Sequence, residues 1–166
     1  MHRLPAIQRA KEQTVTPAAR HARWPWLIGA LILSADQLSK FLFVASFTPG
    51  QSRPLLPPLV YLTYVQNTGA AFGLFKGQQL LFIGISVGVI VWIVSELRGQ
   101  RRPPHPLVGW AYGLILGGAA GNLIDRLRFG YVIDFIDLRV WPVFNIGDSA
   151  LTIGVTLLIW QSFRCK

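Results

Sequence analysis

Apolar residues are concentrated in four long segments, separated by shorter stretches that are polar or rich in proline. The apolar segments cover residues 24–46, 77–97, 107–127 and 144–163. A helix rises about 1.5 Å per residue, so about 20 apolar residues cross the hydrocarbon core of a bilayer. The pattern therefore predicts a mostly α-helical integral membrane protein with four transmembrane helices.

The two connections that precede the second and fourth helices differ in pattern. Residues 48–58 are rich in proline, residues 60–65 alternate in the manner of a strand, and Asn67-Thr68-Gly69 follows as a turn signal. We therefore expect a small β-sheet or loop region between the first and second helices, lying on the membrane surface. Residues 128–143 are mixed in character and predict no regular element.

Glycines recur at helical spacing in two of the predicted helices. Gly84 and Gly88 are four residues apart in the second, and Gly113, Gly117 and Gly121 follow the same interval in the third. Small residues at this spacing let helix backbones approach closely, so we expect packing faces at both places.

The chain is basic, and the location of its charges indicates a topology. It contains 16 Lys and Arg against seven Asp and Glu, a formal charge of +9. The cations gather before the first helix, in the break after the second at 98–102, and after the fourth. By the positive-inside rule both termini lie in the cytoplasm. We expect residues 1–23 to form a basic cytoplasmic extension and residues 24–166 a single membrane domain that binds no nucleic acid.

Composition removes several other classes of protein. With 52% hydrophobic and only 14% charged residues, the chain does not resemble a soluble globular protein. The single cysteine cannot form an internal disulfide, and no Cys/His cluster has the spacing of a zinc site. We therefore expect no metal and no cofactor.

The polar residues of the four predicted helices all fall toward the same side of the membrane. A charge at the centre of the bilayer costs about 2.5–3.5 kcal/mol, so such residues are expected to meet one another or water. Their common depth predicts a shared site near the extracytoplasmic face. The residues are Asp36 and Lys40 in the first helix, Lys76, Gln78 and Gln79 at the start of the second, Asn122, Asp125 and Arg126 in the third, and Asn145 and Asp148 in the fourth, with Asp134 in the loop before the fourth helix.

Spacing suggests local partners for the polar residues of the first and third helices. Asp36 and Lys40 are one helical turn apart and are expected to pair, either as part of the site or only to stabilise each other. Asn122 and Arg126 share the same spacing, so both can point into the bundle. Asp125 is expected to form a structural ion pair with the adjacent Arg126.

Three acids lie in the last outer loop and the first turn of the fourth helix, namely Asp134, Asp137 and Asp148. Asn145 and Asp148 have the spacing of a capping box, an alternative to a functional role. Asp134 and Asp148 are close enough in sequence for a short returning segment to bring them together. Asp137 is expected to be the solvated acid of the loop.

Two carboxyl groups that lie close together cannot both ionise cheaply, so they share a proton, as in aspartic proteases. Such a pair can deprotonate a water molecule and protonate a leaving amine. The three histidines, at positions 2, 21 and 105, lie on the predicted cytoplasmic side, so a Ser/His or His-zinc site is excluded there.

Five motifs, in this order, spacing and topology, resemble those of lipoprotein signal peptidase (signal peptidase II), the peptidase A8 family. The resemblance covers residues 24–163. The motifs are residues 36–40 (DQLSK), 67–73 (NTGAAFG), 117–126 (GGAAGNLIDR), 132–135 (VIDF) and 144–148 (FNIGD). One departure is Gly147, where the family usually has alanine.

The resemblance implies an aspartic endopeptidase of the bacterial inner membrane. It would remove signal peptides from prolipoproteins by cutting before a cysteine that carries a diacylglyceryl group. The catalytic dyad carries over to Asp134 and Asp148. The supporting residues are Asn122, Arg126 and Asn145 around the site, Asp36 and Lys40 bracing it from the first helix, and Asn67 with Gly69 in the outer sheet.

The implied partners are diacylglyceryl-prolipoproteins and membrane lipids, and we expect a monomer. An alternative function is a small transporter or proton channel, since buried charges often mark ion paths. A channel would carry polar residues along its full depth, whereas the cytoplasmic halves of these helices hold almost none. A third alternative is a basic membrane scaffold that catalyses no reaction, but such a protein would not need the clustered acids.

Overall fold

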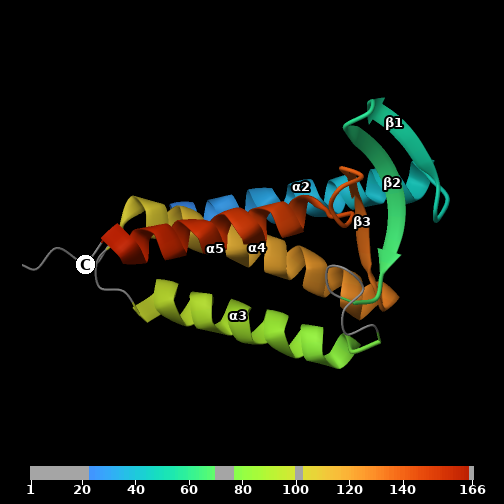
Figure 1. Cartoon of the computed structure of the whole chain (residues 1–166). Helices are drawn as coiled ribbons and strands as arrows, with labels where there is room; N and C mark the ends of the chain where they lie inside the picture. Colours follow the sequence, from blue (N-terminus) through green and yellow to red (C-terminus); the bar gives the residue numbers. More distant parts are fainter. Residues whose placement is uncertain (1–22, 70–76, 100–102, 165–166) are drawn as a thin grey trace, which may run out of the picture.

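The computed structural model describes residues 23–69, 77–99 and 103–164, so nearly all of the predicted N-terminal extension lies outside the described residues. Within these ranges four helices lie side by side (Figure 1). Each is long and apolar enough to cross a membrane, which confirms the predicted fold class. The helices are α2 (Trp24–Ser46), α3 (Gln79–Gly99), α4 (Pro106–Phe129) and α5 (Ile146–Arg164).

Local signals set the limits of α4. Proline at the first helical position, Pro106, lacks the N–H that would have no partner there, and the side chain of His105 accepts a hydrogen bond from the N–H of Leu107. At the other end Gly130 adopts a left-handed conformation with φ 84° and donates its N–H to the carbonyl of Arg126. The helix is thus stopped at the point where the chain must turn into a strand.

Helix α4 lies against α2 and α5, and glycines allow its close contact with α2. A Cβ on Gly113 would lie 2.7 Å from the carbonyl oxygen of Pro25, and one on Gly117 would lie 2.6 Å from that of Gly29. The predicted packing face of this helix is therefore confirmed. The corresponding prediction for α3 is wrong, because a Cβ on Gly84 or on Gly88 would have no neighbour within 4 Å among the residues that the structure describes.

A small antiparallel sheet lies at one end of the helices, and we call this the sheet end (Figure 1). Its strands are β1 (Ser52–Leu56), β2 (Val60–Asn67) and β3 (Val132–Asp137), in the order β1-β2-β3. The expected sheet between α2 and α3 is thus present, but its third strand comes from the connection between α4 and α5.

Strand β3 was not predicted, and its sequence explains the omission. Val-Ile-Asp-Phe-Ile-Asp does not alternate between apolar and polar residues, because almost the whole strand is buried. Asp134 therefore lies on a strand, where its backbone is fixed by pairing with Val65 of β2, and not in a loop as expected.

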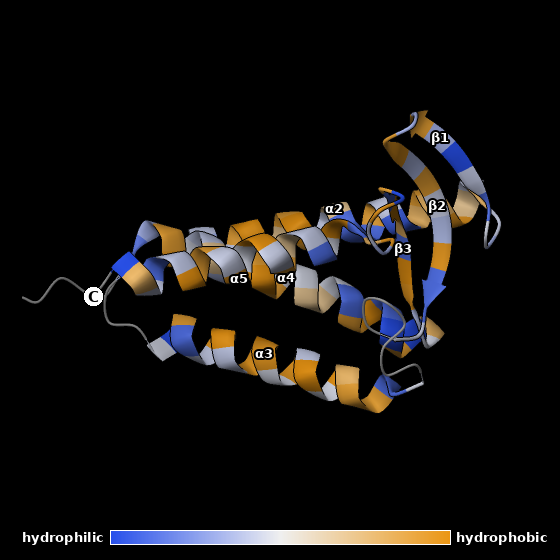
Figure 2. Cartoon of the chain, viewed as in Figure 1, coloured by the Kyte–Doolittle hydropathy of each residue, from blue (hydrophilic) through white to orange (hydrophobic). Residues whose placement is uncertain are grey.

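Aromatic packing joins the sheet to the end of α2. Tyr64, Ile133 and Phe135 form a buried cluster, against which Phe43 and Phe47 pack. The rings of Phe43 and Phe135 are stacked with centroids 4.3 Å apart. The middle parts of the helices are mainly apolar, and hydrophilic residues lie toward both ends, including the sheet end (Figure 2). The stacking of Phe43 on Phe135 therefore holds β3 over the polar ends of the helices.

Candidate active site

Asp134 is a buried residue of strand β3, and each of its carboxylate oxygens accepts one hydrogen bond. Asn67 Nδ2, at the end of β2, lies 2.9 Å from Asp134 Oδ2, and Asn145 Nδ2 lies 2.6 Å from Asp134 Oδ1. The amide oxygen of Asn67 accepts from the N–H of Gly69 at 2.9 Å. Because an N–H can only donate, this contact turns the NH2 group of Asn67 toward the aspartate.

Asp148 lies in the first turn of α5, where it completes the predicted capping box with Asn145. The N–H of Asp148 donates to Asn145 Oδ1 at 2.8 Å, and the N–H of Asn145 donates to Asp148 Oδ2 at 3.2 Å. The other carboxylate oxygen of Asp148 accepts from Asn122 Nδ2 at 2.7 Å. Capping and the site are therefore not alternatives, because the cap fixes the carboxylate in the site.

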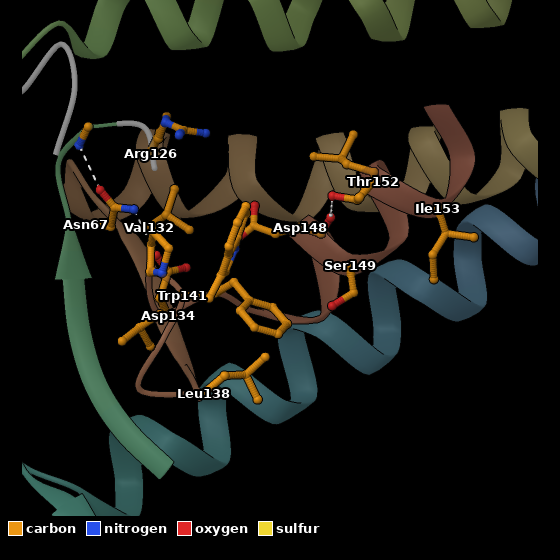
Figure 3. A pocket seen from close by; sticks show the side chains of 15 residues that line it. Asn67, Arg126, Val132, Asp134, Leu138, Trp141, Asp148, Ser149, Thr152 and Ile153 are labelled. Atoms are coloured by element: carbon orange, nitrogen blue, oxygen red, sulfur yellow. Dashed lines mark hydrogen bonds between the residues drawn. The ribbon is translucent and has the colours of Figure 1, made fainter. Parts of the chain in front are cut away.

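Asn145 joins the two acids directly. Its side-chain amide donates to Asp134 and its backbone N–H donates to Asp148, so one fully buried residue holds a carboxyl group from β3 and another from α5. The predicted meeting of Asp134 and Asp148 is thus present in the fold, and both side chains line one cavity (Figure 3).

Lys40 is buried at the centre of three contacts in this network. Its Nζ lies 2.8 Å from Asp36 Oδ2, 2.8 Å from Asp125 Oδ2 and 2.9 Å from Asn122 Oδ1. These contacts use all three donors of the ammonium group. The contact with Asn122 also turns the NH2 group of that amide toward Asp148.

The structure confirms the expected pair between Asp36 and Lys40 and corrects the pairing of Asp125. The partner of Asp125 is Lys40 of α2, not its sequence neighbour Arg126. Adjacent residues on a helix point about 100° apart, so Asp125 faces α2, whereas the Arg126 side chain lines the cavity. The Arg126 guanidinium lies over the ring of Phe82, 5.0 Å from its centroid.

Two further contacts of the network could not be read from the spacing. Gln37 Nε2 donates to Asp125 Oδ1 at 3.0 Å, and the N–H of Gly147 donates to Asp36 Oδ1 at 2.9 Å. Gln37 lies within the first motif, residues 36–40, and its place in that motif is the sequence signal that could have identified it as part of the network. A Cβ on Gly147 would lie 3.1 Å from both Asp36 Oδ1 and the carbonyl oxygen of Gly118. Glycine at this position therefore brings α5 close to α2 and α4.

The dyad opens onto a cavity of about 600 Å³ between β3, α5 and the connecting loop. Most of its wall is apolar, and the polar groups are gathered at the dyad. A cavity of this character suits a substrate that is largely apolar and is polar at one position. The lining residues include Asn67, Gly69, Arg126, Leu138, Trp141, Val143, Leu151 and Ile153 (Figure 3).

Burial, followed by the nearby negative charge of Asp148, raises the pKa of Asp134 to about 7. The hydrogen bonds from Asn67 and Asn145 and the charge of Lys40 act in the opposite direction but do not cancel the rise. An acid with this pKa carries a proton for a large part of the time near neutrality. The site can therefore combine one protonated and one ionised carboxyl group, as acid–base chemistry requires.

The expectation that Asp137 is solvated is wrong. It is only 6% exposed, and it accepts hydrogen bonds from Thr63 Oγ1 at 2.7 Å and from the N–H of Arg139 at 2.8 Å. Burial alone would raise its pKa, but these two bonds and the charge of Arg139 bring the pKa below its ordinary value. Asp137 is three residues from Asp134 on β3, so the two side chains point to opposite faces of the strand.

Across the described ranges, no three His, Cys, Asp or Glu side chains are grouped in a way that could hold a metal ion. The acids of the network are held by amides and by Lys40 instead.

Comparison with known proteins places the chain in a family. The sequence model of "Signal peptidase (SPase) II" matches residues 28–164. The lipoprotein signal peptidase of Moorella thermoacetica is 49% identical over 135 residues, covering 81% of this chain and 89% of that protein. That of Bacillus subtilis is 44% identical over 144 residues, covering 82% and 90%.

Solved structures agree with the sequence comparison. A bacterial membrane enzyme determined at 2.3 Å resolution superposes with a TM-score of 0.77 at 32% identity, covering 84% of this chain and 87% of that one. A second bacterial membrane enzyme, at 1.9 Å, gives a TM-score of 0.73 at 33% identity, covering 82% and 90%. The four spans, the sheet and the matched sequence agree, and the chain therefore belongs to the signal peptidase II family.

Proposed function

We propose that the protein is an aspartic endopeptidase that removes signal peptides from prolipoproteins, with Asp134 and Asp148 as its catalytic dyad. The observation that carries this proposal is the position of Asn145, which donates to one carboxyl group through its side chain and to the other through its backbone. Two acids held in this way at a shared cavity suit the activation of water for peptide hydrolysis.

In the proposed reaction the ionised acid removes a proton from water while the hydroxide attacks the carbonyl carbon of the scissile bond. The protonated acid donates to the carbonyl oxygen, and a proton then passes to the leaving amine as the C–N bond breaks. The amides of Asn67, Asn122 and Asn145 hold the carboxyl groups in place during these transfers. Preorganised donors of this kind need no rearrangement at the moment of reaction.

We assign Asp148 as the ionised base and Asp134 as the protonated acid in the resting enzyme. Asp148 lies in the first turn of α5, where the positive end of the helix dipole favours a negative charge. The raised pKa of Asp134, which burial and the charge of Asp148 cause, favours its protonated form. Infrared titration of the Asp134→Asn and Asp148→Asn variants tests this order, and a carboxyl pKa near 7 remaining in Asp134→Asn would reverse it.

The substrate that suits this site is a prolipoprotein with a diacylglyceryl group on the cysteine after the scissile bond. Its acyl chains remain in the outer leaflet, so the bond arrives at the membrane surface. We place the sheet end at the extracytoplasmic face of the bacterial inner membrane and both termini in the cytoplasm, in accord with the basic flanks of the helices. The enzyme is proposed to act as a monomer in contact with membrane lipids.

A transporter or proton channel is not favoured. The chain belongs to a peptidase family, and the buried charges of the described helices are concentrated near the sheet end, as shown by Asp36, Lys40 and Asp125. Glu96 lies near the C-terminal end of α3, the end of this helix that is away from the sheet (Figure 1).

The decisive experiment incubates the purified protein with a diacylated prolipoprotein and with the same protein lacking the lipid. We expect cleavage of the lipidated form only. Asp134→Asn and Asp148→Asn should abolish turnover while the protein remains folded, whereas Glu96→Gln, a matched loss of a distant carboxylate, should leave turnover unchanged. Substantial cleavage by either dyad variant would contradict the proposed mechanism.

A further inference from the structure

One wall of the cavity is a loop between β3 and α5. Leu138, Trp141, Pro142 and Val143 of this loop all line the cavity, so its apolar side chains are positioned to contact a bound substrate. Leu138 and Trp141 lie among the side chains that surround the cavity in Figure 3. We call residues 138–143 the cavity loop. Because four of its residues line the cavity, a change in its position would change the space beside Asp134 and Asp148.

The two ends of the cavity loop are tied together by the backbone. The N–H of Ile136 donates to the carbonyl of Phe144 at 2.8 Å, and the N–H of Phe144 donates back to Ile136 at 3.1 Å. This bridge closes the loop at its base. Compact surface loops with adjacent ends are frequently functional, but the bridge alone does not fix the path of the residues between.

A second set of contacts holds the cavity loop to the sheet through Arg139. Its guanidinium carbon lies 3.6 Å from the centroid of the Tyr61 ring, and Nη2 donates to Ser52 Oγ at 3.1 Å. Tyr61 belongs to β2 and Ser52 to β1, so a single side chain of the loop reaches two strands. Arginine suits this role because its planar group can stack and donate at once.

Asp137 completes the attachment from the end of β3. It accepts from the N–H of Arg139 and from Thr63 Oγ1, and the latter lies 2.8 Å from Ser52 Oγ. Arg139 has a φ of 63°, a conformation uncommon for a residue other than glycine. The contacts of its N–H and its side chain offset the cost of this conformation. We call Asp137 and Arg139, with their partners on β1 and β2, the loop latch.

The latch and the dyad are held by separate contacts. Asp134 and Asp148 receive their hydrogen bonds from three asparagines, and none of these bonds comes from Asp137 or Arg139. Asp137 also points to the opposite face of β3 from Asp134. Release of the latch should therefore change the wall that contacts the substrate and leave the reacting groups in place.

We propose that Asp137 and Arg139 are positioning residues that fix the cavity loop and so determine how tightly the enzyme holds the apolar part of its substrate. This proposal rests on the proposed function. It assigns the latch to substrate binding, and it separates the acid on β3 that acts on the scissile bond from the acid that shapes the binding wall.

The test measures kcat and KM for a diacylated prolipoprotein with the full-length protein in lipid–detergent micelles. Arg139→Gly removes the side chain and accepts the positive φ, so the backbone is not strained. We expect KM to rise about fivefold to tenfold with kcat within about twofold of wild type, the pattern for loss of binding that is equal in the ground and transition states. Arg139→Lys, which keeps the charge without the planar stack, should give an intermediate KM.

A matched control is Arg128→Ala, which removes another exposed guanidinium stacked on a ring, that of Phe129, outside the latch. Its KM should equal that of wild type. Thr63→Val, which keeps the side-chain shape and removes the donor to Asp137, provides a second route if Arg139→Gly fails to fold, and it should also raise KM.

A wild-type KM in folded Arg139→Gly or Thr63→Val, or a fall in kcat at unchanged KM, would overturn the latch. Full recovery of KM by Arg139→Lys would show that only the charge matters and would also overturn it. These results differ from failure of the proposed function, in which the wild-type protein does not cleave the substrate or Asp134→Asn retains turnover.

Discussion

Asn122 Nδ2 lies 2.7 Å from Asp148 Oδ1, and the oxygen of the same amide accepts a hydrogen bond from the buried ammonium group of Lys40. The amide can therefore present only its NH2 group to the aspartate. This arrangement connects a charged cluster of α2 and α4 to the proposed base on α5.

Loss of the Asn122 amide should slow the reaction. Asn122→Leu has nearly the same shape but neither donates nor accepts, so Asp148 loses a fixed donor. We expect kcat to fall about 10²-fold, as for loss of one preorganised donor, with KM little changed. Gln66→Leu is the matched control, because it removes an exposed amide of β2 that donates to Tyr131. Wild-type kcat in Asn122→Leu would contradict the role of the amide.

Lys40 should be essential for stability as well as for the site. Lys40→Met leaves Asp36 and Asp125 buried without their cation, and loss of one partner from a buried ion pair costs about 3–5 kcal/mol. We therefore expect a large fall in the thermal unfolding midpoint in detergent. Arg98→Met serves as the control for loss of an exposed cation, because Arg98 lies in the last turn of α3, at the end of that helix away from the sheet. An unchanged midpoint in Lys40→Met would contradict this account of the cluster.

The proposed dyad predicts a pH-dependent activity. The pKa of Asp134 is raised to about 7 by burial and by the charge of Asp148, so the proton that the reaction requires is lost as the pH rises above this value. We expect kcat/KM to fall on the alkaline side of about pH 7, measured with the diacylated substrate. A profile that stays flat from pH 7 to about pH 9 would show that the reaction does not depend on this proton.

The same pKa predicts a direction for stability. Asp134 binds its proton in the folded protein up to about pH 7, whereas in the unfolded chain it loses the proton near the ordinary pKa of 3.8. The folded state therefore holds more protons between these values, and the free energy of unfolding should decrease as the pH rises through them. Asp134→Asn should reduce this slope in chemical unfolding measured at several pH values. An equal slope in both proteins would argue against the raised pKa.

The contact between α4 and α5 should not tolerate an added methyl group. A Cβ on Gly118 would collide with the carbonyl oxygen of Gly147, next to Asp148. We expect Gly118→Ala to lower stability by about 1–3 kcal/mol and to reduce turnover, because α5 must move. Gly84→Ala on α3, which meets open space, should be neutral or stabilising by helix propensity. Equal behaviour of the two variants in thermal unfolding and turnover would contradict the close contact.

The helices and the members of the site could be predicted because they depend on local features. Apolar length defines a membrane span, and the common depth of the polar residues follows from their positions along those spans. The capping box of Asn145 and Asp148 and the pair of Asp36 with Lys40 also depend on spacing within one helix, and both are present.

The errors concern contacts between distant segments. Sequence spacing pairs Asp125 with its neighbour Arg126, but its partner Lys40 lies on another helix. The loop position of Asp137 predicts contact with water, but this residue is covered by strand β2, which belongs to a different connection. Strand β3 was missed because a strand buried on both faces has no alternating pattern. Spacing in one sequence does not indicate which remote element will cover a residue.

Asp134 on the third strand of the sheet and its partners are synthesised at different times, and this has a consequence for when the site becomes complete. Residues that hold Asp134 come from β2, synthesised early, and from Asn145 at the start of the last helix. On the proposed mechanism, a nascent chain with three inserted spans has no complete pair of acids. Hydrolytic capacity therefore begins only when the ribosome has delivered the final span, so unfinished copies in the bilayer are inert.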